Sequence, residues 1–501
     1  MLLLRIAVAA AYVLLAAGCG GGDPTDAEAS HASVGTPVAG MTPFVASVRL
    51  AGVDVARLSG AAFVIEPKLG ATAAPVQASF DAAWLRRSNR SSVADGTIVL
   101  PLFGLYSGWN NQVTLKLAFE DGSVQVLRLS FATTAYVDPH AVYDQPVVMK
   151  GRAPSQAIGF NYFYMKSGYG PPVVVDTDGE IRWADIGTFN SQASLFADNG
   201  FYVVTGLTMR RLELDGTETV IGMISSSDVD YLRFTHNMDY GKAGLLVEPD
   251  AKIDGVDNLE SMLTEIDASG QVLHEWNLAE IVSRYMTAAG DDPSTVVRPG
   301  VDWFHLNAAF YDRRDDSILV SSRENFVMKI DYASGDLKWV FGDPTKYWYQ
   351  SPSLRARALT LTNDGLYPDG QHAVTITPTG ELMIFDDGQP SSNPPAGGNA
   401  GEFRTFSSVA TYGIDDAALT ATQHWSFDYG QQIKAPFCSS AAQVADGSVL
   451  ISYATADNFT HARLVGLDPQ RNVVFDFQYD TTPCDTSWNA QVIPLESMRF
   501  Q

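Results

Sequence analysis

Three histidines occupy matching positions in a recurring strand pattern. In several hairpins a polar residue opens the first strand, and Gln192, His372 and Ser439 each stand eight positions before the turn glycine. His236 and His305 fall at the same place when short differences in length are allowed. If the repeats are arranged radially, equivalent positions form a ring around one end of a central channel. The pattern therefore predicts that His236, His305 and His372 converge.

Two further polar residues are predicted to join these histidines. His305 begins a strand that runs to a turn at Asp315-Asp316, and the return strand ends at Arg323. Strands of similar length bring Arg323 back to the end where His305 lies. Asn307 stands two residues after His305 and points to the same side of its strand.

Two chemistries suit three imidazoles and a guanidinium. The histidines could hold Zn²⁺ with an open position for water, as in a metal-dependent lyase or hydrolase. They could instead bind a tetrahedral oxyanion with one histidine as nucleophile. Arg323 favours the anion, because a guanidinium suits sulfate- or phosphate-like oxygens and a fixed positive charge disfavours a neighbouring metal dication. We therefore expect no metal and no cofactor.

A non-enzymatic alternative also remains open. If the histidines are only structural, the chain would be a lipid-anchored binding protein. We expect a structural role for the other five histidines, which are His31, His140, His274, His424 and His461.

The element that must position these residues is a strand that ends in an acidic turn, followed by a strand that closes on an aromatic residue. Copies begin at Val175, Leu212, Ile266, Ile330, Ile414 and Leu467, about 40 to 80 residues apart. Four-stranded propeller blades need about 40–50 residues, so the excess is loop insertion, including a helical insert over 277–286. The pattern predicts a six-bladed β-propeller over residues 136–501. A large sandwich with coincidental turns would not explain the regular Asp and Trp positions.

The region before the repeat has short alternating strands and tight turns. One pair is 113–119 and 124–131, joined by Glu120-Asp121-Gly122. Residues 43–135 are therefore predicted to form a small N-terminal β-sandwich, which makes the whole chain all-β.

Residues 1–18 have the pattern of a signal peptide, with Arg5 before an apolar run that is too short to span a membrane. The end of this segment, Ala16-Ala17-Gly18-Cys19, is similar to a bacterial lipobox and predicts lipidation of Cys19, although ordinary cleavage nearby is the alternative. Gly20 after the cysteine favours outer-membrane sorting, so we expect a periplasmic lipoprotein with a flexible tether over 19–42. In an oxidising compartment Cys438 and Cys484 could form a disulfide or remain free thiols.

The composition excludes several classes of partner. The chain has 33 basic and 57 acidic residues and a formal net charge of −24, which disfavours nucleic acid and anionic membrane surfaces. With 46% hydrophobic and 18% charged residues, it has ample material for a packed core. We expect small-molecule substrates, membrane contact only through the lipid, and an oligomeric state that the sequence leaves open, with a homodimer as one option.

The segments around the predicted site resemble the bacterial arylsulfate sulfotransferases. The resemblance is carried by Asp302-Trp303-Phe304-His305-Leu306-Asn307, Ser321-Ser322-Arg323, Lys338-Trp339-Val340-Phe341-Gly342, Gly370-Gln371-His372 and Phe385-Asp386-Asp387-Gly388, and at the N-terminal side by Leu100 to Tyr106.

This resemblance implies transfer of a sulfuryl group from an aryl sulfate donor to a phenol acceptor, without a nucleotide donor. It implies that His372 is the nucleophile that becomes sulfurylated. His236, His305 and Arg323 would bind the sulfuryl oxygens, with Asn307 as a helper. We expect the run 386–402 to form a rim or lid, and four aromatic residues to be candidates for stacking on phenols: Tyr162, Phe163, Trp303 and Phe326.

Overall fold

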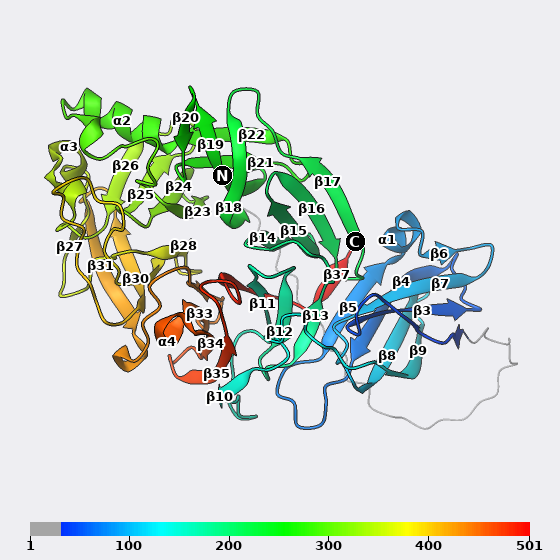
Figure 1. The fold of residues 1–501 in the computed structure, drawn as a ribbon. Coiled ribbons are helices and arrows are strands. Elements are labelled where there is room, and N and C mark those ends of the chain that lie inside the picture. The colour runs from blue at the N-terminus through cyan, green and yellow to red at the C-terminus, as the bar shows by residue number, and fades with distance from the viewer. Residues whose placement is uncertain (1–31) are drawn as a thin grey trace, which may run out of the picture.

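The computed structural model describes residues 32–501. The predicted signal peptide, Cys19 and most of the predicted tether lie outside the described residues. Two bodies make up the described chain, a smaller β-sandwich and a larger ring of sheets (Figure 1). No helix among residues 32–501 is long and apolar enough to cross a membrane.

The N-terminal body consists of two five-stranded sheets packed face to face. One sheet contains β1 (Ser33–Val34), β2 (Val38–Ala39), β3 (Val45–Ala51), β6 (Ser91–Ser92) and β7 (Thr97–Phe103). The other contains β4 (Leu58–Ile65), β5 (Val76–Asp81), β8 (Asn110–Phe119), β9 (Val124–Ala132) and β37 (Met498–Phe500). The helix α1 (Ala82–Arg87) follows β5, and Asp81 caps it by accepting from the Trp84 amide. Alternating residues such as Phe63 and Leu115 point inward and are fully buried.

Both ends of this sandwich differ from the sequence expectation. Strands β1 and β2 lie within the segment expected to be a tether, and they pair with β3. The chain end leaves the ring and adds β37 beside β5, in parallel. Phe500 then stacks on Phe80 with ring centroids 4.9 Å apart. Burial of the Phe500 side chain against Phe80 stabilises the pairing of the last residues with the sandwich.

The larger body is a six-bladed β-propeller, as predicted. From the channel outward, the first blade is β36 (Asn489–Ile493), β11 (Tyr162–Lys166), β12 (Val173–Asp176) and β13 (Ile181–Ala184), and the second is β14 (Ala193–Ala197), β15 (Gly200–Thr205), β16 (Thr208–Glu213) and β17 (Glu218–Met223). The third is β18 (Asp230–Tyr240), β19 (Leu245–Ile253), β21 (Met262–Ile266) and β22 (Val272–Asn277), with β20 (Val256–Asn258) on β19, and the fourth is β23 (Leu306–Asp312), β24 (Ser317–Ser322), β25 (Val327–Asp331) and β26 (Leu337–Phe341). The fifth is β28 (His372–Ile376), β29 (Leu382–Asp386), β30 (Ser408–Asp415), β31 (Thr420–Phe427) and β27 (Thr360–Leu361), and the sixth is β32 (Ser440–Gln443), β33 (Val449–Thr455), β34 (His461–Leu467), β35 (Val473–Asp480) and β10 (Val147–Lys150). The late strand β36 pairs with the early strand β11 and closes the ring. Short helices lie in the connections: α2 (Leu278–Ala288), α3 (Pro352–Arg355), α4 (Ala456–Phe459), η1 (Pro293–Thr295), η2 (Tyr347–Gln350) and η3 (Tyr429–Gln431).

The repeated acidic turn and aromatic residue have distinct structural roles. In the turn after β21, Asp267 Oδ1 accepts from the amides of Ser269 and Gln271, and Gly270 has a φ of +82° that suits glycine. The tryptophan that closes a blade donates its indole N–H to the next blade: Trp183 to Leu214 O (3.0 Å), Trp276 to Tyr332 O (3.0 Å) and Trp339 to Asp416 Oδ1 (2.7 Å). The repeat that predicted the fold therefore reflects turn formation and contact between blades.

Candidate active site

Three inner strands each bend at a histidine: His236 lies within β18, His305 directly precedes β23, and His372 begins β28. His236 and His305 have φ of +52° and +53°, and Ala373, next to His372, has +49°. The register of pairing shifts at each of these places, between Thr235 and Met238 in β18, Leu306 and Ala308 in β23, and His372 and Thr375 in β28. Non-glycine residues adopt this backbone region only where the surrounding structure holds them there, and such bulges re-aim side chains.

The three imidazoles meet at a cavity of about 360 Å³. The ring centroids of His236 and His305 are 4.9 Å apart, and those of His305 and His372 are 6.4 Å apart. The cavity is lined by Gln192, Arg233, Thr235, His236, Glu260, His305, His372, Phe437, Cys438, Cys484 and Trp488. The structure thus brings together the three histidines that the repeat singled out.

Arg323 follows β24 and lies beside His305, where its amide donates to the His305 carbonyl oxygen (3.1 Å). Its buried guanidinium donates from Nη1 to Glu324 Oε1 (2.8 Å) and Ser392 Oγ (3.0 Å). Its Nε and Nη2 have no hydrogen-bond partner among residues 32–501. Arg323 is not itself among the residues that line the cavity, but its guanidinium lies over the ring of Phe437, which is.

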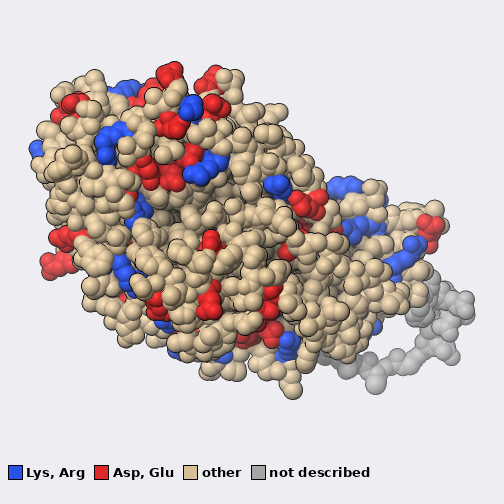
Figure 2. All heavy atoms as spheres, in the orientation of Figure 1, with Lys and Arg blue, Asp and Glu red and all other residues tan. Residues whose placement is uncertain are grey.

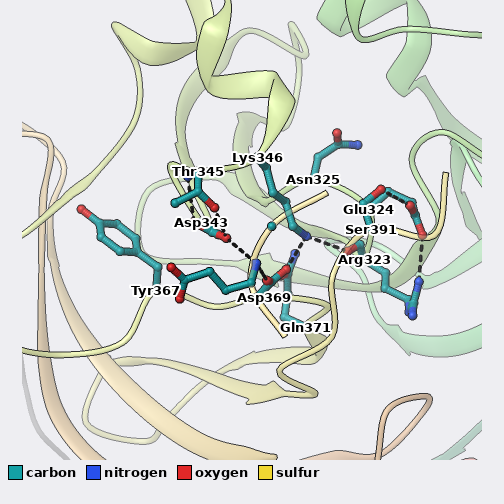
Figure 3. Close-up of polar contacts among 12 residues, drawn as sticks. Arg323, Glu324, Asn325, Asp343, Thr345, Lys346, Tyr367, Asp369, Gln371 and Ser391 are labelled. Atoms are coloured by element: carbon teal, nitrogen blue, oxygen red, sulfur yellow. Dashed lines mark hydrogen bonds and ion pairs between the residues drawn. The ribbon is translucent and has the colours of Figure 1, made fainter. Parts of the chain in front are cut away.

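A buried polar network contacts Arg323 and its backbone (Figure 3). Lys346 donates to the Arg323 carbonyl oxygen (3.4 Å) and forms an ion pair with Asp369 (2.6 Å), and neither side chain is exposed. Ser391 donates to Glu324, the carboxylate that also holds Arg323. Because Ser391 and Ser392 belong to the run 386–402, this segment packs over Arg323.

Asn307 does not line the cavity. Its Nδ2 donates to the carbonyl oxygen of Gln371 (2.8 Å), the residue before His372. Asn307 therefore holds the backbone next to the expected nucleophile.

A carboxylate that the sequence analysis did not assign to catalysis contacts His372. Asp387 Oδ2 lies 2.7 Å from His372 Nδ1, and both side chains are buried. Burial, then the charges of Arg323 and His305, lowers the pKa of His372 well below its ordinary value. Burial also raises the pKa of Asp387, which Arg323 and Lys434 oppose. Asp387 follows β29, the return strand from His372, so the reasoning that placed Arg323 beside His305 could have found it.

The other two histidines share acidic partners. His305 Nδ1 lies 2.6 Å from both Asp302 Oδ2 and Glu260 Oε2, and His236 Nδ1 lies 3.7 Å from Glu260 Oε1. Burial opposes the charge on His305, but its close contacts with the carboxylates of Asp302 and Glu260 outweigh burial and raise its pKa to about 10. Burial lowers the pKa of His236. Burial would raise the pKa of Glu260, but His236 and His305 lower it to about 2.

These acidic partners were also missed by sequence reasoning. Glu260 lies between β20 and β21, outside the histidine repeat, so no sequence signal pointed to it. Among residues 32–501, one group has the donors and spacing for a metal ion, with ligand atoms of His236, Glu260 and His305 all within 4.8 Å of one another.

A disulfide joins Cys438 and Cys484 at the edge of the cavity. The two neighbouring aromatic residues form walls of the cavity: Phe437 lies under the Arg323 guanidinium (4.6 Å), and Trp488 contacts His236 edge to face (5.2 Å). The aromatic residues suggested from sequence are instead fully buried in the packing clusters, and none lines the cavity: Tyr162, Phe163, Trp303 and Phe326.

Comparisons with known proteins extend these observations. A family model described as Arylsulfotransferase (ASST) matches residues 149–489. Arylsulfate sulfotransferase AssT of Escherichia coli O6:H1 is 26% identical over 245 residues, and that of Lelliottia amnigena is 23% identical over 256 residues. These matches cover 40% and 41% of this chain and 40% and 42% of the relatives, so the chain spans about two fifths of their length.

Two solved structures are similar at 11% identity. One is the β-propeller domain of Cps50 (Swd1) from Myceliophteria thermophila, with a TM-score of 0.33 and coverage of 68% of this chain and 100% of that chain. The other is AztD of Citrobacter koseri, with a TM-score of 0.26 and coverage of 77% and 81%. Since the family model matches well over half of the sequence, the chain belongs to the arylsulfotransferase (ASST) family.

Proposed function

We propose that this protein transfers a sulfuryl group from a phenolic sulfate ester to a phenol through a sulfurylated His372, without a nucleotide donor. The contact between His372 Nδ1 and buried Asp387 is the observation that carries the proposal. In its ionised form, which the charges of Arg323 and Lys434 favour, Asp387 accepts but does not donate, so it holds a proton on Nδ1 and leaves the Nε2 lone pair free. The lowered pKa of His372 keeps this imidazole neutral and nucleophilic.

In the first half-reaction, His372 Nε2 attacks sulfur, the N–S bond forms, and the S–O bond to the aryl group breaks. The electron pair leaves with the aryl oxygen as an aryloxide. Positive charge on the sulfurylated ring is stabilised by Asp387, while His236, the His305 imidazolium and the two free donors of Arg323 bind the sulfuryl oxygens.

In the second half-reaction, the acceptor phenol oxygen attacks the same sulfur and the N–S bond breaks, which restores neutral His372. Overall, the phenolic proton of the acceptor appears on the released donor phenol, so charge and protons balance. Phe437 and Trp488 supply aromatic walls against which both rings could pack. Two half-reactions at one site give ping-pong kinetics.

The test is incubation with 4-nitrophenyl sulfate, with and without a phenol acceptor. Nitrophenol release that depends on acceptor supports transfer, whereas release without acceptor would indicate a hydrolase. The His372→Ala variant should lose transfer by several orders of magnitude, and near-normal activity would overturn the nucleophile assignment. His424→Ala, a change at an exposed histidine outside the cavity, is the matched control.

We also propose that the protein is exported to the periplasm and anchored at the outer membrane by a lipid on Cys19. Residues 1–20 support this, because an apolar run ends in small residues before the cysteine. Incorporation of labelled palmitate into the wild type but not into Cys19→Ser would support the anchor. Equal labelling of both would contradict it.

A further inference from the structure

His305 faces more acceptors than it can satisfy. Its Nδ1 carries one hydrogen at most, yet oxygens of Asp302 and Glu260 both lie 2.6 Å away. The hydrogen bond of good geometry goes to Asp302. Glu260 Oε2 has no hydrogen-bond partner of good geometry among the described residues. A cation placed between these atoms would satisfy the carboxylate that a single proton leaves unpaired.

The backbone holds this cluster in place. His236, Glu260 and His305 belong to three separate segments, and all three have left-handed φ, at +52°, +45° and +53°. The Glu260 carbonyl oxygen accepts from the Leu306 amide (2.7 Å), and the Glu260 amide donates to Asp250 Oδ1 (2.8 Å). Such conformations are unfavourable for residues other than glycine and persist where neighbours hold them. The three donor groups are therefore preorganised.

We propose that His236, Glu260 and His305 bind one Zn²⁺ ion. Two imidazoles and one glutamate form a zinc donor set that leaves a fourth position open. Ligands of a tetrahedral zinc lie about 3.3 Å apart, since each bond is about 2.0–2.1 Å long. The ligand atoms here all lie within 4.8 Å of one another, so small side-chain shifts complete the site.

Arg323 disfavours a metal less than the sequence alone suggests, because acidic groups surround the site. Arg323 is already paired with Glu324 (2.8 Å), and Glu260 lies between the two histidines. The local charge therefore favours a cation more than the histidines and arginine alone would suggest.

Zinc on His305 Nδ1 and a proton on the same atom exclude each other, because both use one lone pair. The effect on activity rests on the proposed function: a metal here occupies two of the imidazoles assigned to the sulfuryl oxygens, so zinc should slow transfer. Binding of the metal itself does not depend on that function.

The test is equilibrium dialysis of the folded protein against Zn²⁺, without any sulfate ester, followed by metal analysis. We expect about one ion per chain for the wild type. Glu260→Gln and His236→Gln should each weaken binding at least tenfold. His424→Gln is the matched control, since His424 also contacts a glutamate, Glu381, but lies outside the cluster. The Co²⁺ absorption spectrum gives a second readout, with a tetrahedral signature that Glu260→Gln loses.

Equal zinc affinity in all four proteins, or no binding by the wild type at micromolar zinc, would overturn the site. Circular dichroism checks that each variant is folded. Zinc should also slow transfer by the wild type, and a chelator should restore it. Unchanged transfer by zinc-loaded protein would overturn the exclusion between metal and substrate. If the chain transferred no sulfuryl group at all, the dialysis result would still stand, so the two failures are distinguishable.

Discussion

Two histidines in one cavity have opposite charge preferences because their neighbours differ. The rings of His305 and His372 lie 6.4 Å apart. His305 contacts two carboxylates, which outweigh the effect of burial and keep its ring protonated. His372 is buried near Arg323 and contacts one carboxylate, and its pKa falls. Environment thus gives one protonated and one neutral imidazole, which suits the anion-binding role proposed for His305 and the nucleophilic role proposed for His372.

The pair of Asp387 and His372 yields the first prediction. Asp387→Asn keeps the size of the side chain but removes the carboxylate that holds the proton on Nδ1. We expect transfer to fall by roughly 10²–10⁴, as expected when the wrong tautomer dominates. The ¹⁵N shifts of His372 should report the change of tautomer. A purely structural role for Asp387 would lower stability without altering those shifts.

The pH profile of donor capture provides the second prediction. His372 must be neutral, and its lowered pKa keeps it so until well below the ordinary histidine range. His305 must be charged, and its pKa of about 10 keeps it so until the pH approaches that value. We expect kcat/KM for the donor to be flat across neutral pH and to fall as the pH rises through about 10. A fall centred near the ordinary histidine pKa of about 6.5 would contradict this assignment.

Some residues of the site occupy positions of the sequence repeat, and others do not. His236, His305 and His372 were predictable because equivalent strands place them at one end of the channel. Glu260 was not, because it reaches the site from an irregular connection in a single blade. Asn307 is not among the residues that line the cavity, and its amide donates to the Gln371 backbone, so the helper role expected for it stays a prediction.

At the scale of elements, the outer hairpins explain why the propeller could be predicted from the sequence. Asp267 and its equivalents accept turn amides, and the closing tryptophans bond to the next blade. Because these turn and inter-blade contacts recur along the chain, the residues that make them form a periodic sequence pattern. The bulges at the inner strands leave none, because left-handed φ at His236 or His305 arises from tertiary contacts.

The disulfide ties two elements at the cavity and gives the third prediction. Cys438 precedes β32 and Cys484 precedes β36, and the two cysteines are 46 positions apart in sequence. Closing such a loop is worth about 2–4 kcal/mol. We expect the double variant Cys438→Ala/Cys484→Ala to lose about that much free energy of unfolding. Its KM for the donor should rise, because Phe437 and Trp488 lose their support.

Denaturant titration with and without a reductant checks this. The reductant should destabilise the wild type and leave the double variant unchanged. If both proteins have the same stability under oxidising conditions, the disulfide does not stabilise the fold.

At the scale of the whole molecule, the C-terminal strands β36 and β37 connect the two bodies. The late strand β36 closes the propeller on β11, and the chain then continues into the sandwich as β37 (Figure 1). Phe500 packs there on Phe80 and Trp84. Pairing between strands so far apart in sequence has no local sequence pattern, which is why the boundaries of the two bodies were harder to predict than their fold class.

The net charge supplies the last prediction. The chain carries −24, and removal of residues 1–18, whose one charged residue is Arg5, would make it one unit more negative. Acidic and basic side chains are interspersed on the face seen in Figure 2. The net charge should therefore repel the proposed anionic donor at long range, while the buried His305 and Arg323 should attract it at the site. Salt screens the long-range repulsion, with a Debye length of about 30 Å at 0.01 M and about 10 Å at 0.1 M, but screens buried charges much less.

Raising sodium chloride over this range should therefore leave kcat/KM for the donor unchanged or increase it up to a few-fold. Ping-pong kinetics allow kcat/KM for the neutral phenol acceptor to be measured separately, and it should not respond, because no net charge approaches the protein in that step. A fall of about tenfold for the donor would show that attraction at the cavity extends into solvent and dominates the global charge. The same fall in both half-reactions would point instead to chloride bound at Arg323, and sodium acetate at equal ionic strength would separate that case.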